Sequence, residues 1–198
     1  MSTELIIKLR EVTGAGIMDC RNALKESNND VEKACQWLRE KGMAFAVKKT
    51  RRVVRQGLVY SYIHGNGILG VLVEVNCETD FVAKTEDFRI LVKEIAMQIA
   101  ATSPIYVSRE QVPESVLNAE KEIYKAQLKE KKKPEKIWDK IIEGKIEKFY
   151  GQICLYNQIY IRDINGKETI KDLVTRAVVK VGENIVIKRF ARFKLGEE

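Results

Sequence analysis

The spacing of hydrophobic residues changes at Gly57, and that change restricts the folds open to the chain. Before Gly57, apolar residues recur at the spacing of one face of an α-helix. After it, two apolar, β-branched runs, 58–64 and 68–77, flank the turn sequence Gly65-Asn66-Gly67. That arrangement predicts a β-hairpin. We therefore expect a helical N-terminal region followed by a core that contains strands.

Three short helices are expected in residues 1–43. The third has its apolar residues at positions i, i+3, i+4 and i+7, and Gly42 is expected to end it. A bundle of this size buries little surface, so we expect a docking module that depends on a partner. Residues 44–56 are expected to continue as a basic helical linker, and residues 57–198 to form the core domain.

The core is expected to combine the hairpin with several helices and a returning strand. A helix beginning near Thr85 has one apolar stripe, formed by Phe88, Leu91, Val92, Ile95 and Ile99. The clearest amphipathic helix follows the turn at Asn165-Gly166, and its stripe is Ile170, Leu173, Val174, Ala177, Val178 and Val181. A final strand is expected from Ile185 to Phe193. The predicted fold class is α+β, with a small antiparallel sheet packed by helices.

Charge and targeting signals restrict the partners only weakly. Lys and Arg total 35 against 28 Asp and Glu, a formal charge of +7, which is compatible with a nucleic-acid, membrane or acidic-protein partner. Only the segment 48–55 is purely basic, and a solvated linker helix is the preferred interpretation of it over RNA binding. The sequence lacks a signal peptide and a membrane-spanning apolar run, so we expect a cytoplasmic protein without a membrane partner.

Motifs of known enzymes and metal sites are missing from the sequence. The four cysteines are far apart and form no CxxC pair, which argues against a disulfide framework and a zinc site. The single histidine, His64, excludes HExxH chemistry, and neither a Walker A loop nor a GxGxxG fingerprint occurs. A binding module without cofactor or metal is favoured over an enzyme.

Three longer segments carry more specific information. They are 10–24 (REVTGAGIMDCRNAL), 74–84 (EVNCETDFVAK) and 181–190 (VGENIVIKRF). In this order and at these spacings they resemble the elongation factor Ts family, in its short form with one core. Segments 143–150 and 154–155 also resemble the family, so the match covers nearly the whole chain. One departure is Glu78, where many members carry Gln.

The resemblance implies a fold, a partner and an activity. The fold would be a small ubiquitin-associated-like helical domain, a linker and an α+β core that serves dimerisation and exchange. The partner would be elongation factor Tu bound to GDP, with no direct contact to nucleic acid required. The chain would act in translation elongation as a guanine-nucleotide exchange factor and not as an enzyme: it would loosen GDP and Mg²⁺ and then be displaced by GTP. Short forms are generally homodimers, which the resemblance implies here as well.

The resemblance also implies which residues act in exchange. It assigns dislocation of the partner's Mg²⁺ to one short segment, formed by Asp80, Phe81, Val82 and Ala83 and flanked by Thr79 and Lys84. Two interpretations of this segment remain open. In one, Phe81 is an apolar wedge that enters the partner. In the other, Phe81 and Val82 are core residues at the end of a strand and Asp80 is a helix cap.

A second set of residues is implied for docking of the N-terminal domain onto the partner's nucleotide domain. It consists of Val12, Ile17, Met18 and Arg21. The alternative interpretation places Ile17 inside the bundle and makes Met18 a surface residue that fills a gap. Val12 fits the docking patch and the core equally well.

Three competing functions remain open at this point. The first is an adaptor with a ubiquitin-associated-like domain and no exchange activity. The second is an RNA-binding protein that uses the basic segment 48–55, which predicts a steep dependence of RNA affinity on salt. The third is a hydrolase that uses His64, for which the sequence offers no nucleophile motif.

Overall fold

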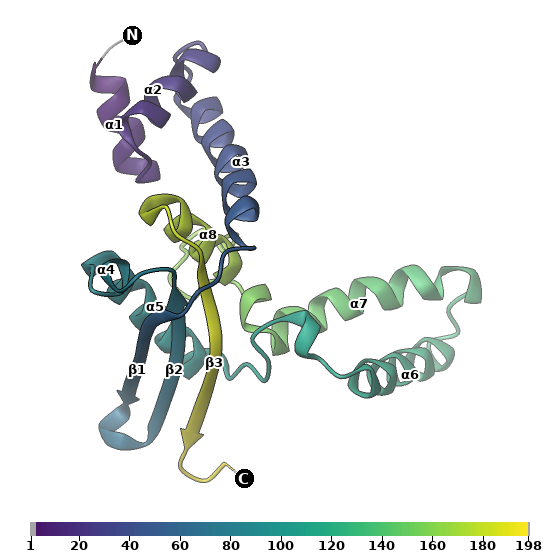
Figure 1. Ribbon diagram of the computed structural model, residues 1–198. Helices are drawn as coiled ribbons and strands as arrows, with labels where there is room; N and C mark the ends of the chain where they lie inside the picture. Colours follow the sequence, from purple (N-terminus) through teal and green to yellow (C-terminus); the bar gives the residue numbers. More distant parts are fainter. Residues whose placement is uncertain (1–2, 198) are drawn as a thin grey trace. The chain divides into compact units, whose positions relative to one another are not determined.

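The computed structural model describes residues 3–197 (Figure 1). These residues divide into two compact units. The first unit contains the described residues up to Leu58 together with Val75–Val92 and Asp172–Val186. The second contains Val59–Glu74, Lys93–Lys171 and the described residues from Ile187 onward.

Three helices form an N-terminal bundle in the first unit: α1 (Thr3–Thr13), α2 (Ile17–Glu26) and α3 (Val31–Lys49). Their buried residues form one hydrophobic cluster, which consists of Leu9, Ala15, Cys20, Ala23, Leu24 and Ala34. Trp37 packs against this cluster and remains partly buried. Asp30 caps α3 by accepting a hydrogen bond from the Lys33 backbone N–H at 3.1 Å. The helical N-terminal region predicted from the sequence is therefore present.

The prediction that Gly42 ends the third helix is wrong. Helix α3 continues through Gly42 to Lys49. Only the non-helical residues between Lys49 and Gln56 separate it from the first strand. A glycine inside a helix costs about 1 kcal/mol relative to alanine. Here the missing side chain has a packing role, because a Cβ at Gly42 would lie 3.1 Å from Val179 Cγ2. Gly42 allows a close approach of α3 to that valine and does not act as a stop.

The sheet has three strands, β1 (Gln56–His64), β2 (Leu69–Cys77) and β3 (Ile185–Lys194), in the order β1-β2-β3. Neighbouring strands run antiparallel (Figure 1). The hairpin turn is the short 3₁₀ helix η1 (Gly65–Gly67). Gly57 has φ +147°, and a Cβ there would lie 2.2 Å from the Val75 carbonyl oxygen, so this position requires glycine. The predicted hairpin, returning strand and α+β class are confirmed.

The predicted amphipathic helices place their apolar stripes inside. Helix α5 (Glu86–Thr102) follows the short helix α4 (Asp80–Ala83), and all five residues of its predicted stripe are buried. Helix α8 (Ile170–Val181) buries Ile170, Leu173, Val174 and Val178. Three further 3₁₀ turns are η2 (Arg109–Gln111), η3 (Glu135–Ile137) and η4 (Leu155–Asn157).

Helices α6 (Glu114–Glu130) and α7 (Trp138–Ile153) form a helical hairpin in the second unit (Figure 1). The hairpin has its own small core, in which Leu128, Ile142 and Ile146 are buried beneath partly buried aromatic side chains. One of these is Trp138, whose indole N–H donates to the Lys133 carbonyl oxygen at 2.9 Å. Across residues 3–197, every helix is too short or too polar to cross a lipid bilayer.

Candidate functional site

Helix α4 lies directly after β2 and contains the four residues assigned to exchange. Thr79 is its N-cap, with extended backbone angles and a hydroxyl that accepts from the Val82 backbone N–H at 3.4 Å. Ala83 is buried, whereas the Phe81 side chain is 78% exposed. The interpretation of Phe81 as a core residue, with Asp80 as the cap, is therefore wrong.

Asp80 and Lys84 form an exposed ion pair on α4. Lys84 Nζ lies 2.7 Å from Asp80 Oδ2, at the i,i+4 spacing of one helix face. This hydrogen bond and the charge of Lys84 lower the pKa of Asp80 from its ordinary value. Asp80 therefore presents an ionised carboxylate on the same short helix that carries the exposed ring of Phe81.

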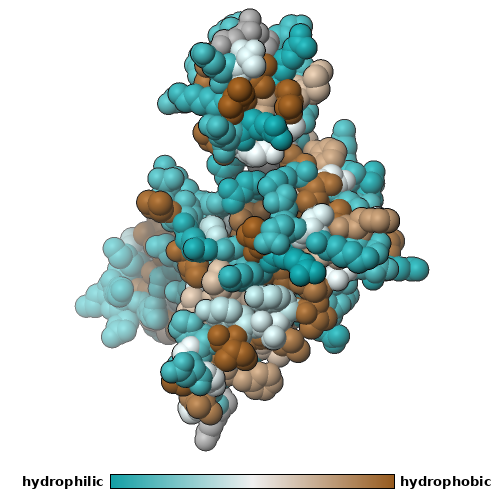
Figure 2. Space-filling model, turned by 90° about the vertical axis from the view of Figure 1, so that its left-hand side faces the viewer, coloured by the Kyte–Doolittle hydropathy of each residue, from teal (hydrophilic) through white to brown (hydrophobic). Residues whose placement is uncertain are grey.

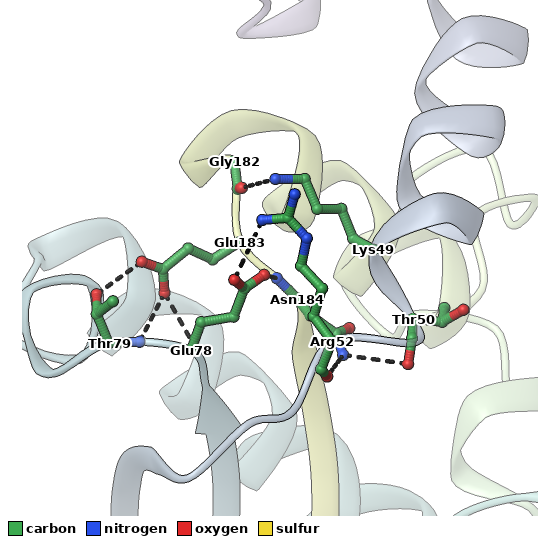
Figure 3. A network of polar contacts seen from close by, with 8 residues as sticks. All are labelled: Lys49, Thr50, Arg52, Glu78, Thr79, Gly182, Glu183 and Asn184. Atoms are coloured by element: carbon green, nitrogen blue, oxygen red, sulfur yellow. Dashed lines mark hydrogen bonds and ion pairs between the residues drawn. The ribbon is translucent and has the colours of Figure 1, made fainter.

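Glu183, in the turn between α8 and β3, holds the residues that precede α4 (Figure 3). Its Oε1 accepts from the Thr79 hydroxyl at 2.6 Å. Its Oε2 accepts from the backbone N–H of Thr79 at 3.0 Å and of Glu78 at 3.2 Å. Hydrogen bonds to a carboxylate are about twice as strong as those between neutral groups, so this contact fixes the start of α4 firmly.

The neighbouring residue, Asn184, joins the same turn to the segment after α3. Its backbone N–H donates to Glu78 Oε1 at 2.7 Å, and its side-chain amide donates to the carbonyl oxygens of Thr50 at 3.4 Å and Arg52 at 2.9 Å. The hydrogen bond from the Asn184 backbone N–H, supported by the Arg52 guanidinium 3.3 Å away, lowers the pKa of Glu78. Three segments far apart in the sequence are thus tied together at this point.

Lys49, the last residue of α3, completes the network. Its Nζ donates to the carbonyl oxygen of Gly182 at 2.7 Å. Gly182 ends α8 in the left-handed region with φ +75°, as expected for a helix stop. The turn between α8 and β3 is therefore held by Lys49 on one side of Glu183 and by the contacts of Asn184 on the other.

The residues assigned to docking lie on the surface of the N-terminal bundle. Val12, Ile17 and Met18 are 66%, 56% and 62% exposed, and Arg21 is exposed as well. Val12 is in the last turn of α1 and Ile17 begins α2, so these residues flank one short turn. The alternative placement of Ile17 inside the bundle is wrong. Figure 2 shows hydrophobic side chains (brown) gathered on this bundle, at the top of the view.

Comparison with known proteins decides the family. The family model described as Elongation factor TS matches residues 18–197. The chain belongs to the elongation factor Ts family. An elongation factor Ts of Caldanaerobacter subterraneus subsp. tengcongensis is 58% identical over 197 residues, which cover 100% of this chain and 98% of that relative. Those of Thermoanaerobacter sp. strain X514 and Thermotoga neapolitana are 57% and 53% identical, over 100% of this chain and 96% and 98% of theirs.

In this member of the elongation factor Ts family, the buried thiol of Cys77 and the ring of His64 each have a hydrogen-bond partner within the chain. Cys77 is buried and donates its S–H to the Thr79 carbonyl oxygen at 3.1 Å, and burial raises its pKa to about 11. His64 Nδ1 lies 2.9 Å from the Tyr62 hydroxyl at the exposed end of β1. In the part of the chain that the structure describes, no group of three or more His, Cys, Asp or Glu side chains is placed to hold a metal ion.

The residues that support α4 could not be predicted from the sequence. The partners of Glu183, Asn184 and Arg52 are the residues just before α4, which lie more than about 25 positions away in the sequence. No periodic pattern connects such distant positions. The available signal was the family resemblance of segment 181–190, which contains Glu183 and Asn184 but gives no contact partner.

Proposed function

We propose that this chain is a guanine-nucleotide exchange factor that binds elongation factor Tu·GDP and promotes release of GDP. GTP then binds the partner and displaces the factor. The observation that carries this proposal is Phe81, a large aromatic side chain that stands 78% exposed on a short, firmly anchored helix. Exposed aromatic surface of this kind favours a partner that covers it. Membership of the elongation factor Ts family supports the choice of that partner.

In this proposal the exposed face of α4 acts on the partner's Mg²⁺ site. The Phe81 ring enters between elements that hold the partner's switch region, while the Asp80 carboxylate reorganises hydrogen bonds there. Val82 and Ala83 belong to the same segment, and Thr79 and Lys84 flank it. Mg²⁺ demands near-ideal octahedral coordination, so a small displacement of its ligands weakens its binding. Loss of Mg²⁺ then weakens the binding of GDP.

Thermodynamics restricts what such a factor does. It lowers the partner's affinity for nucleotide, and nucleotide lowers the partner's affinity for the factor by the same coupling free energy. The factor therefore accelerates exchange without choosing GTP over GDP. A typical coupling of about 1–3 kcal/mol changes affinity about 5–150-fold, and effective exchange needs more than that. Displacing the Mg²⁺ is a way to obtain a larger coupling free energy.

The N-terminal bundle supplies docking affinity in this proposal. Val12, Ile17, Met18 and Arg21 offer an apolar surface with one cation. Methionine adapts its shape to a partner, and arginine is enriched among residues that dominate interface energies. These four residues would set the concentration at which the factor works, while α4 would set how fast GDP leaves.

We also propose that the chain forms a homodimer. A groove of about 250 Å³ lies on the part of the sheet that belongs to the second unit. It is lined by Val59, Leu72, Phe190 and Ala191, together with the ion pair of Glu74 and Arg189 at 2.7 Å. A second copy would cover this apolar surface. Sedimentation at micromolar concentration should give a dimer mass, and a monomer mass would contradict the proposal.

The remaining features of the proposal concern chemistry and location. The chain would carry out no covalent reaction, would need no cofactor of its own and would make no required contact with nucleic acid. It would act in the cytoplasm, where translation takes place.

The test is stopped-flow release of fluorescent GDP from the cognate elongation factor Tu, with and without this protein. We expect the native chain to accelerate release strongly, in a manner that saturates with its concentration. Release at the unassisted rate would overturn the proposal. In that case, RNA affinity measured against salt concentration would test the basic segment 48–55 as a nucleic-acid site.

A further inference from the structure

Helix α4 is too short to hold itself in place. It has four residues, and an isolated helix of that length is not stable in water because nucleation costs more than its few hydrogen bonds return. Its orientation must come from contacts with the rest of the first unit. On one side this contact is the buried methyl group of Ala83, and at its start the contacts are those of Glu183.

Glu183 also determines how the cap of α4 works. The Thr79 hydroxyl has one proton, and it donates that proton to Glu183 Oε1 at 2.6 Å. Its lone pairs are then left free to accept the Val82 N–H, which is the capping hydrogen bond of α4. Hydrogen bonds in such a chain strengthen one another. Without the carboxylate, the hydroxyl would be free to rotate and the cap would weaken.

The backbone that carries Glu183 is held in a fixed position. Gly182 is bound by Lys49 through its carbonyl oxygen, and Asn184 is 3% exposed and bonded to Glu78, Thr50 and Arg52. Figure 3 shows these contacts on both sides of Glu183. A glutamate on a flexible loop would lose backbone entropy as well as side-chain entropy to make the same contacts. Here the turn between α8 and β3 is already ordered, so the loss is mainly that of the side chain.

We propose that Glu183 is a positioning residue for nucleotide exchange: it holds Thr79 and thereby orients Phe81 and Asp80 toward the partner. This inference rests on the proposed function. It assigns Glu183 no contact with the partner. The exposed ring of Phe81 is effective only at the correct angle, and that angle is determined by the residues before α4.

The proposal predicts a particular kinetic result. Glu183→Ala should lower the maximal rate of GDP release at saturating factor by about tenfold, which corresponds to a barrier about 1.4 kcal/mol higher. The concentration of factor at half-maximal rate should change little, because the docking residues on the N-terminal bundle remain. Glu183→Gln should retain more of the rate, because its amide oxygen still accepts a hydrogen bond. Thr79→Val should resemble Glu183→Ala, because it lacks the hydroxyl.

A double variant tests whether Glu183 acts through Phe81. If it does, adding Glu183→Ala to Phe81→Ala should slow release by clearly less than the roughly tenfold expected in the native background, because only the orientation of Asp80 is still lost. Independent effects that multiply would overturn the proposal. The matched control is Asp87→Ala, which removes an exposed ion pair with Lys180 at 2.7 Å and should leave release unchanged.

Thermal unfolding of each variant separates positioning from loss of fold. A fall in rate that only follows the unfolded fraction of Glu183→Ala and Glu183→Gln would overturn the proposal, as would a Glu183→Ala variant that matches the native chain. Failure of the proposed function is distinguishable, because it would appear first as a native chain that does not accelerate release.

Discussion

The exposed surfaces of α4 and of the turn between α1 and α2 differ in how they are supported. Both present large apolar side chains, Phe81 on one and Ile17 and Met18 on the other. The α1–α2 surface rests on a hydrophobic cluster made by its own three helices, within the first 40 residues. Helix α4 is instead held by charged and polar groups from two other parts of the chain, chiefly Glu183.

The two kinds of support fix different properties of a surface. An apolar cluster is non-directional and fixes which residues are outside, which is enough for docking. Hydrogen bonds to a carboxylate depend on distance and angle, and they fix the direction of a single side chain. In the proposed function the surface of α4 displaces a metal ion, so it needs the second kind of support. The four predictions that follow test this distinction, in order of decreasing effect.

The largest effect is expected from Leu24→Ala in the bundle. Leu24 is fully buried, and leucine-to-alanine changes in cores cost about 2–5 kcal/mol. A small bundle cannot absorb that loss, so thermal unfolding followed by circular dichroism should show an early transition. The concentration of factor at half-maximal GDP release should rise steeply. Ile7→Ala, on the exposed side of α1, is the control. An unchanged half-maximal concentration would show that docking does not need the bundle.

A smaller effect is expected from Phe81→Ala. The maximal rate of GDP release should fall at least about tenfold, or about 1.4 kcal/mol, because the apolar wedge is lost. The thermal unfolding temperature should hardly change, since the side chain is 78% exposed. Ile123→Ala, at an exposed position on α6, is the matched control. A normal maximal rate would mean that α4 is not the exchange surface.

The docking residues should show the opposite kinetic pattern. Ile17→Ala and Met18→Ala should each raise the half-maximal concentration by several-fold, or about 1 kcal/mol, as for interface residues of moderate weight. The maximal rate should stay near that of the native chain. A fall in maximal rate with unchanged half-maximal concentration would remove the distinction between the two surfaces.

The smallest effect is expected from Glu78→Gln. Glutamine keeps an acceptor for the Asn184 N–H and loses the charge that faces Arg52, a change worth under about 1 kcal/mol for a partly exposed pair. The pKa of Glu78 is lowered in the folded protein, so its contribution to stability is present above its unfolded pKa and is lost as pH falls through the folded pKa. Urea unfolding should therefore show a native-minus-variant difference that is largest near neutral pH and shrinks toward acid. A difference independent of pH would contradict this cause.

The amphipathic elements of the fold could be predicted from the sequence, because their pattern is local. Phe88, Leu91 and Val92 repeat at helical spacing, and burial of one face follows from that spacing. Gly42 was misjudged because a glycine is read locally as a stop, whereas its role here is contact with Val179. The segment proposed for exchange could be predicted only through the family resemblance. Its supports could not be predicted, because the pairing of Glu183 with Thr79 spans 104 residues.

The two tryptophans of the chain have different surroundings, and this has a spectroscopic consequence. Trp37 packs on the cluster of the N-terminal bundle in the first unit, and Trp138 on the core of the α6–α7 hairpin in the second. With Trp37→Phe or Trp138→Phe, the remaining indole emits alone, and its wavelength and quenching report on one unit only. The chain thus contains a natural optical probe in each unit, and local opening of the bundle can be followed without attaching a dye.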